Sequence, residues 1–138
     1  MEGESLDLVV SKLTGEKYFG FESALHHWSL ANWINRKPQI LSKTTTAEFQ
    51  TYDKIKCING WDDFVQSPKS GLFYTNKERT ICDMILYERC EELIFNSLDD
   101  YLYMDKIPVE NLMKYARKYN VEDKLNYYIS ELDDFLFY

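Results

Sequence analysis

The spacing of apolar residues changes near residue 76, and this change limits the chain to a small set of folds. Between residues 76 and 137, apolar side chains recur every three or four positions, which is the period of amphipathic helices. Between residues 36 and 75, they tend to alternate with polar ones, and β-branched residues are frequent, as in strands. We therefore expect a small β-sheet followed by a helical half.

Four helices are predicted in the helical half. Either Thr75 or Asn76 can cap the first, which has Glu78 near its positive end. Pro108 suits the first turn of the third helix, and Asn120 is expected to cap the fourth. The apolar faces are expected at Tyr87, Cys90, Ile94, Leu98 and Tyr101 in the second helix, Leu112, Met113, Ala116 and Tyr119 in the third, and Val121, Leu125, Tyr128, Ile129 and Leu132 in the fourth.

Shorter elements are predicted before residue 76. One helix is expected over residues 5–13, ending at Thr14-Gly15, and a second from Gly20 or Phe21 to Leu30. Strands are expected at residues 38–42, 53–58 and 71–75, with Phe49 and Tyr52 in the same sheet, while residues 61–65 fit no single type. The sequence thus predicts a single α+β domain over residues 1–138, with short N-terminal helices, a small mixed β-sheet and a helical C-terminal half.

Acidic residues are concentrated in the helical half. The chain of 138 residues has a formal net charge of -7, and residues 76–138 hold 14 acidic and 8 basic side chains. Such a surface repels phosphate backbones and attracts basic partners, which argues against duplex DNA as a partner.

The sequence also favours a cytoplasmic location. It has no run of about 18 apolar residues, so no membrane span is predicted. Its acidic start, residues 1–7, lacks the features of a signal peptide. Cys57, Cys82 and Cys90 follow no metal-ligand spacing, and we expect them to be reduced and buried.

No catalytic, cofactor-binding or metal-binding residues are predicted. His26 and His27 are the only histidines, and neighbouring helical positions point about 100° apart, which disfavours shared metal ligation. A magnesium-dependent nuclease would need acidic residues on adjoining strands, and Glu22 with Asp53 is the nearest approach to that pattern. The usual Glu-x-Lys pair is absent, so a nuclease using Asp53 remains a minor alternative.

Basic residues gather in the predicted sheet region, at Arg36, Lys37, Lys43, Lys54 and Lys56. With Trp33, Phe49 and Tyr52 nearby, they form a candidate basic-aromatic face for RNA or a nucleotide. The same lysines also suit an edge strand, where they prevent pairing between molecules. Both interpretations fit the sequence, and the second is the simpler one.

Arg79 and Asp83 are spaced to pair on one helical face. The pair is most simply a structural link between helix and sheet, with a binding role as the alternative. The tail, residues 132–138, is expected to pack back on the helical half, since an exposed patch of that size would promote association.

Two segments about fifty residues apart resemble a known family. Residues 18–30 fit the pattern Y-x-G-x-x-S-A-L-x-x-x-x-L, and residues 78–83 fit E-R-T/A-hydrophobic-hydrophobic-D. Together they resemble the C-terminal antitoxin domain of AbiEi-type proteins, the antitoxins of bacterial abortive-infection (type IV toxin–antitoxin) systems. Residues 36–41 and 107–119 extend the resemblance, which covers Lys17 to about Leu132. The family usually has Gly where this chain has Ser29.

The resemblance implies a protein without its own chemistry that neutralises a nucleotidyltransferase toxin, by contact with the toxin or by competition at its target. Family members usually carry an N-terminal winged helix-turn-helix, and only about sixteen residues precede the resembling segment here, so DNA binding is not carried over. The alternative is a phage or mobile-element inhibitor that binds a host defence protein, because an acidic, aromatic-rich surface can mimic nucleic acid.

Overall fold

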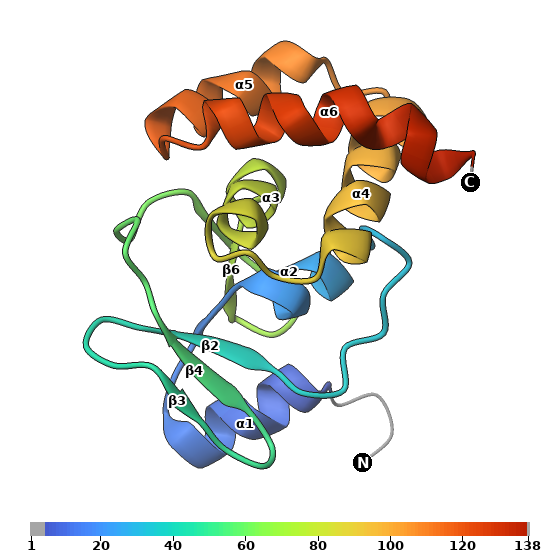
Figure 1. The fold of residues 1–138 in the computed structure, drawn as a ribbon. Coiled ribbons are helices and arrows are strands. Elements are labelled where there is room, and N and C mark those ends of the chain that lie inside the picture. The colour runs from blue at the N-terminus through green and yellow to red at the C-terminus, as the bar shows by residue number, and fades with distance from the viewer. Residues whose placement is uncertain (1–4, 138) are drawn as a thin grey trace.

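The order of the elements follows the change in apolar spacing (Figure 1). In the computed structural model, which describes residues 5–137, two short helices and six strands occupy the chain up to residue 75 and helices follow it. The predicted α+β class is confirmed. The elements are α1 (Leu6–Thr14), β1 (Tyr18–Phe19), α2 (Phe21–His27), β2 (Gln39–Ser42), β3 (Ala47–Glu48), β4 (Asp53–Lys56), β5 (Phe64–Gln66), β6 (Phe73–Thr75), α3 (Lys77–Leu86), α4 (Glu91–Asp99), the π-helical turn η1 (Asp100–Met104), α5 (Val109–Lys118) and α6 (Glu122–Leu136).

The strands form one mixed sheet of six in the order β3-β4-β2-β1-β6-β5. β1 pairs in parallel with β6, and β2 pairs in parallel with β4, while the other neighbours are antiparallel. The two halves of the sheet meet at β1, whose Phe19 pairs with Ile40 on one side and Tyr74 on the other. The sequence prediction omitted β1, although it lies near the centre of the sheet.

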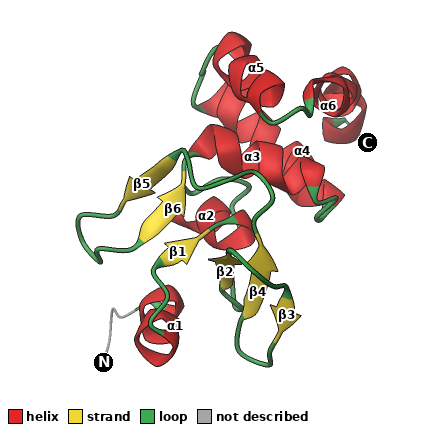
Figure 2. Ribbon diagram, turned by 90° about the vertical axis from the view of Figure 1, so that its left-hand side faces the viewer, coloured by secondary structure: helices red, strands yellow, loops and turns green. Residues whose placement is uncertain are grey.

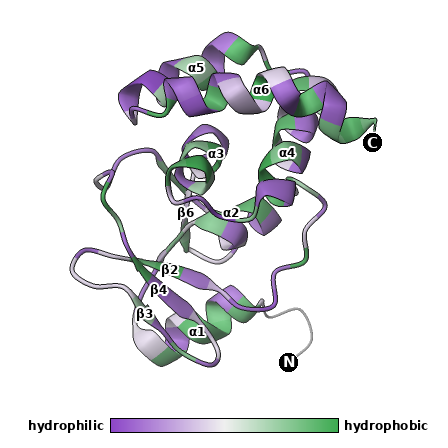
Figure 3. Cartoon of the chain, viewed as in Figure 1, coloured by the Kyte–Doolittle hydropathy of each residue, from purple (hydrophilic) through white to green (hydrophobic). Residues whose placement is uncertain are grey.

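Buried apolar side chains form two clusters on opposite sides of the sheet. The smaller cluster joins Val10 of α1 to Phe19, Ile40 and Tyr74 of the central strands. The larger one includes Leu41 and continues through α2 and α3 into the C-terminal helices. Figures 1 and 2 show α1 at one end of the molecule and α5 and α6 at the other. Along α5 and α6, Figure 3 shows apolar residues interrupted by polar ones, as expected for helices with one buried side.

Several helix ends confirm the capping predictions. Gly15 ends α1 with a φ of 78°, a left-handed conformation that glycine adopts without a Cβ clash. The Asn76 side chain accepts a hydrogen bond of 2.8 Å from the backbone N–H of Arg79 and so caps α3.

Other predicted helix bounds are wrong. α2 ends at His27 rather than Leu30, because Ser29 and Ala31 turn the chain away with φ values of 57° and 61°. Asn120 follows α5 in the left-handed region and does not cap α6, where Val121 holds that position. Pro108 immediately precedes α5 instead of lying in its first turn.

The second predicted helix is also shorter than expected. Since α4 begins at Glu91, Tyr87 and Cys90 lie before it, although Ile94, Leu98 and Tyr101 are buried as predicted. Tyr101 belongs to η1, which continues α4. The carboxylate of Asp100 in η1 accepts a hydrogen bond of 2.7 Å from the backbone N–H of Ala31. η1 therefore holds the loop between α2 and β2.

The tail packs on the helical half, as predicted, up to Leu136. Leu132 is buried, and the Phe135 ring stacks on Phe95 with a centroid distance of 4.5 Å. Phe137 is an exception, since 84% of it is exposed, and Tyr138 lies outside the described residues.

The prediction of buried thiols is confirmed only for Cys82. Cys57 is half-buried and Cys90 is exposed, and all three thiols are free. Within residues 5–137, no helix combines the length and the apolar character that a membrane crossing requires.

Candidate functional site

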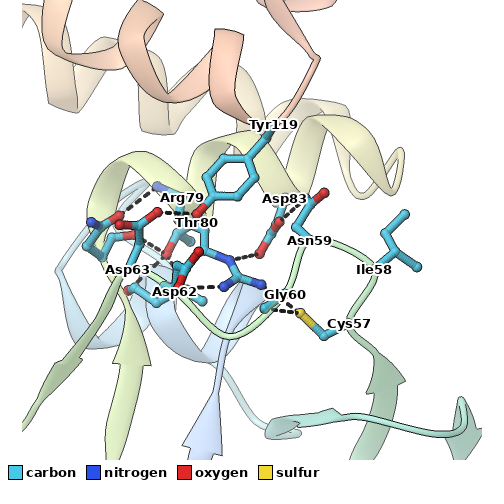
Figure 4. A network of polar contacts seen from close by, with 12 residues as sticks. Cys57, Ile58, Asn59, Gly60, Asp62, Asp63, Arg79, Thr80, Asp83 and Tyr119 are labelled. Carbon is cyan, nitrogen blue, oxygen red and sulfur yellow. Dashed lines mark hydrogen bonds and ion pairs between the residues drawn. The ribbon is translucent and has the colours of Figure 1, made fainter.

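Arg79 is the centre of a buried polar network between α3 and the loop from β4 to β5 (Figure 4). Its Nε donates to Oδ2 of Asp83 at 3.1 Å, which confirms the predicted pairing. Its Nη1 donates to the backbone carbonyl of Asp62 at 2.6 Å, and its Nη2 lies 2.6 Å from the sulfur of Cys57. The guanidinium is 0% exposed, so these partners replace its hydration.

Aromatic rings complete the surroundings of Arg79. The guanidinium carbon lies 5.2 Å from the centre of the Phe64 ring and 5.5 Å from that of Tyr119. Phe64 comes from β5 and Tyr119 follows α5, so one side chain joins the sheet to two helices. Burial alone would lower the pKa of Arg79, but the Asp83 carboxylate raises it above its ordinary value. Arg79 is therefore a permanent buried cation with a structural role.

The other predicted basic residues do not form one face. Arg36 and Lys37 line one cleft, Lys43 and Lys54 line a separate hollow, and Lys56 is exposed on β4. The edge-strand interpretation is wrong for Lys54, because β3 pairs with β4 at that residue. The predicted aromatic companions also lie elsewhere. Phe49 and Tyr52 stack on each other at 4.7 Å beside the β3–β4 turn, and Trp33 lies at the cleft.

The larger opening, called here the α2–α4 cleft, has a volume of about 740 Å³. It lies between the loop that precedes β2 and the segment from Tyr87 to Leu93. Residues of contrasting chemistry line it, among them Glu22, Trp33, Ile34, Arg36, Lys37 and Arg89. Trp33 is 38% exposed and Ile34 68% exposed, so apolar surface borders charged groups there.

The charged groups of the α2–α4 cleft are largely paired. Arg89 and the buried Glu22 form an ion pair with a closest distance of 2.5 Å. Lys37 lies 3.0 Å from Asp53 and 3.2 Å from Glu48, and these carboxylates raise the pKa of Lys37. Arg36 is exposed and forms no ion pair within residues 5–137. It is therefore the cation of the cleft that remains open to a partner.

The smaller opening, called here the β1–β2 hollow, has a volume of about 440 Å³. Glu16 and Tyr18 border it from the β1 side, and residues 41–44 border it from the β2 side. Lys54 of β4 and Trp61 of the β4–β5 loop complete it. It brings together two predicted lysines, but with aromatic residues that the sequence prediction did not select.

The two histidines have different surroundings. Nδ1 of His26 lies 2.9 Å from the carbonyl oxygen of Trp33, while the His27 ring stacks on Tyr74 at a centroid distance of 3.9 Å. Burial lowers the pKa of His27. The two rings therefore point in different directions, as neighbouring helical positions do.

The two acidic residues of the possible nuclease pattern, Glu22 and Asp53, each form an ion pair with a basic residue of the chain. Glu22 is paired with Arg89, and Asp53 is paired with Lys37. In the part of the chain that the structure describes, no group of three or more His, Cys, Asp or Glu residues is arranged to hold a metal ion.

Comparison with known proteins gives no further guide to the site, since no family model and no curated protein sequence matches the chain.

Sequence reasoning missed Trp61 and Tyr18 of the hollow and the pairing of Glu22 with Arg89. The hollow is built from β1, β2, β4 and a loop, so its members share no local spacing. Glu22 and Arg89 are 67 positions apart and leave no local signal. The dipeptide Asn59-Gly60 is a turn signal, and it could have indicated that Trp61 lies beside the end of β4.

Proposed function

We propose that this chain is a non-enzymatic, antitoxin-like protein of the cytoplasm, which neutralises a nucleotidyltransferase toxin of a bacterial abortive-infection system. The observation that carries the proposal is the packing of the two AbiEi-like segments. Phe21 and Leu25 of α2 share one buried cluster with Ile81 of α3. The Trp28 indole N–H also donates to the carbonyl of Thr75, three residues before the second segment, at 2.7 Å. Two patterns far apart in sequence thus meet in one structural unit.

The conformation of Ser29 gives independent support. The AbiEi-like pattern usually has glycine at this position, and Ser29 has a φ of 57°. Glycine is favoured in this left-handed region because it has no Cβ. The backbone at Ser29 therefore has the shape that the family's usual residue suits best.

Most residues of the AbiEi-like pattern are buried, so other side chains would have to contact a partner. The α2–α4 cleft is our candidate contact surface. Trp33, Ile34 and Arg36 are exposed there, and Trp and Arg are frequent among the residues that dominate protein interfaces. Neutralisation then requires binding to the toxin or to its target, with no reaction at the cleft.

Growth rescue tests the proposal. The chain is co-expressed with the nucleotidyltransferase toxin from its own locus, and surviving colonies are counted with and without it. We expect rescue by the wild-type chain. A Trp33→Ala variant should lose at least about tenfold in survivors, because a central interface aromatic often contributes roughly 2 kcal/mol or more. Tyr127→Ala, which removes an exposed aromatic ring of α6, is the matched control and should rescue normally.

Circular dichroism of both variants establishes that they are folded. Absence of rescue by folded wild-type protein would contradict the antitoxin proposal. Normal rescue by Trp33→Ala would leave that proposal standing and remove the cleft as the contact surface.

The acidic surface supports a second candidate function, the inhibition of a host defence protein. Exposed acids lie on the first turn of α4 and along α6, at Glu91, Glu92, Asp123, Asp133 and Asp134. This role requires a stoichiometric complex with a nucleic-acid-handling enzyme that moderate salt dissociates. Recovery of such a complex from host lysate, combined with no rescue, would favour it.

A further inference from the structure

The β1–β2 hollow contains two lysines without a carboxylate partner. Within residues 5–137, neither Lys43 nor Lys54 forms an ion pair, whereas Lys37 and Lys118 each form two. Lys43 instead lies over the Trp61 ring, with Nζ 5.3 Å from the ring centre. The ammonium groups at this hollow are therefore available to an external anion.

The hollow exists because β1 and β2 pair at one position only. Phe19 faces Ile40 in the register, but the residues before Phe19 and those after Leu41 line opposite sides of the opening. Lys54 is the register partner of Ile40 on β4, so its side chain leaves the sheet on the Ile40 face and borders the opening from that side. Lys54 lies within β4, and Lys43 directly follows β2, so the sheet positions both lysines at the opening.

The wall of the hollow is aromatic. The Trp61 ring meets the Tyr18 ring edge-on at 5.1 Å, and Trp61 stacks with Phe64 at 5.6 Å. These neighbours hold the indole in place and leave the Lys43 side chain over the ring. Lys43 is exposed and has a flexible stem, so it can move off the indole without disturbing the core.

A carboxylate also borders the hollow. Glu16 is half-buried and precedes β1 in the chain. It would repel a bare inorganic anion, but it can accept hydrogen bonds from sugar hydroxyls, as acidic residues do in dinucleotide sites. The volume of about 440 Å³ lies within the range of small-ligand pockets.

We propose that the β1–β2 hollow binds a nucleotide. Lys43 and Lys54 hold the phosphate group, Trp61 contacts the base, and Glu16 accepts from the ribose. The base takes the position over Trp61 that Lys43 now occupies, and Lys43 turns to the phosphate. This site is separate from the α2–α4 cleft and from the antitoxin proposal, so either proposal can fail without the other.

The test is titration of the purified chain with ATP by calorimetry, compared with adenosine and inorganic triphosphate. We expect ATP to bind more tightly than adenosine or inorganic triphosphate, because adenosine can contact only Trp61 and Glu16, and triphosphate only the two lysines. Lys54→Ala and Lys43→Ala should each weaken ATP binding at least about tenfold, since a hydrogen bond to a charged group is lost. Lys114→Ala, which removes an exposed lysine of α5, is the matched control and should bind as the wild type does.

Fluorescence provides a second readout. ATP should quench tryptophan emission of the wild type by displacing Lys43 from the indole. The quench should vanish in Trp61→Phe, while Trp28 and Trp33 still report an intact fold. A short single-stranded RNA, titrated in parallel, distinguishes the two sources of the nucleotide. Tighter binding of the RNA with the same lysine dependence assigns the hollow to RNA.

Three results would overturn the proposal. The first is absence of binding of both ATP and RNA at millimolar concentration. The second is ATP binding that Lys54→Ala leaves unchanged. The third is equal affinity for ATP and inorganic triphosphate, which would reduce the site to a general attraction for anions.

Discussion

At the scale of single residues, Arg79 has the most demanding environment in the described chain. A fully buried guanidinium needs partners that replace its hydration, and each of its three nitrogens has one, in Asp83, Asp62 and Cys57. Asp83 is itself buried and accepts a further hydrogen bond of 2.9 Å from the Asn59 side chain. Removal of Arg79 would leave this carboxylate without its cation.

We therefore expect Arg79→Ala to lower the free energy of unfolding by about 3–5 kcal/mol, the usual cost of breaking a buried ion pair from one side. Arg79→Lys keeps the charge but cannot reach Asp62 and Cys57 together, so its loss should be intermediate. Urea unfolding followed by circular dichroism measures both. Arg36→Ala is the control, since loss of an exposed arginine should change stability by less than about 0.5 kcal/mol. An equal effect of Arg79→Ala and Arg36→Ala would refute the structural role of Arg79.

At the scale of elements, the turn from β1 into α2 is closely packed. Gly20 joins the two, and a Cβ at this position would lie 3.1 Å from Cδ2 of the buried Leu41. Phe21 follows directly with a φ of 53°, which bulky residues seldom adopt. A side chain at Gly20 would thus force the buried Leu41 side chain to shift.

Gly20→Ala should lower stability by about 1–3 kcal/mol, the range for an overfilled core. The backbone of Gly20 has a φ of -153°, which alanine adopts freely, so the effect reports packing against Leu41 less the smaller stabilisation that alanine gives by restricting the unfolded chain. Combining it with Leu41→Val should then be less harmful than the two single losses added together. Thermal unfolding of the four proteins in this cycle measures the coupling. Strict additivity would show that Leu41 does not limit the site.

The elements predicted from sequence are those whose signal is local. The alternation in β2 and β4, the cap at Asn76 and the apolar periods of α5 and α6 needed no distant partner. β1 has only two residues, and it pairs with Phe73 and Ile40, which are distant from it in the sequence. No pattern of residues near Tyr18 indicates this pairing. The candidate site follows the same rule. The spacing of Arg79 and Asp83 predicted their pairing, but no local pattern indicated the contacts that Arg79 makes with the β4–β5 loop.

At the scale of the whole molecule, Asp63 links the sheet to the C-terminal helices. Its carboxylate lies 2.8 Å from Nζ of Lys118 and accepts a hydrogen bond from the Tyr119 hydroxyl. Burial acts to raise the pKa of Asp63, but these two partners outweigh it and hold that pKa below its ordinary value of 3.8. The folded state therefore favours the ionised form.

The lowered pKa of Asp63 determines how the stability of the fold depends on pH. A carboxyl with a lowered folded pKa contributes stability above about pH 4, and the contribution is lost as the pH falls through the lowered value. Asp63→Asn removes the charge, and asparagine tolerates the φ of 63° at this position. We expect the free energy of unfolding of the wild type to exceed that of this variant by about 0.5–1 kcal/mol at pH 7, after allowance for solvent screening, and the difference to shrink as the pH falls below about 4. Urea unfolding at pH 7, 5, 4 and 3 measures the difference, and a constant difference would contradict the link.

The two-residue strand β1 also has a consequence for biosynthesis. Tyr18 and Phe19 find their parallel partners in Phe73 and Tyr74, which leave the ribosome much later. Until β6 has emerged, the N-terminal residues have no complete sheet to join, and Phe19 remains exposed to solvent and to chaperones. Non-local pairing of this kind slows folding. A stalled nascent chain that ends before residue 73 should therefore stay sensitive to protease, and protection should appear as one step once β6 and α3 are free of the exit tunnel.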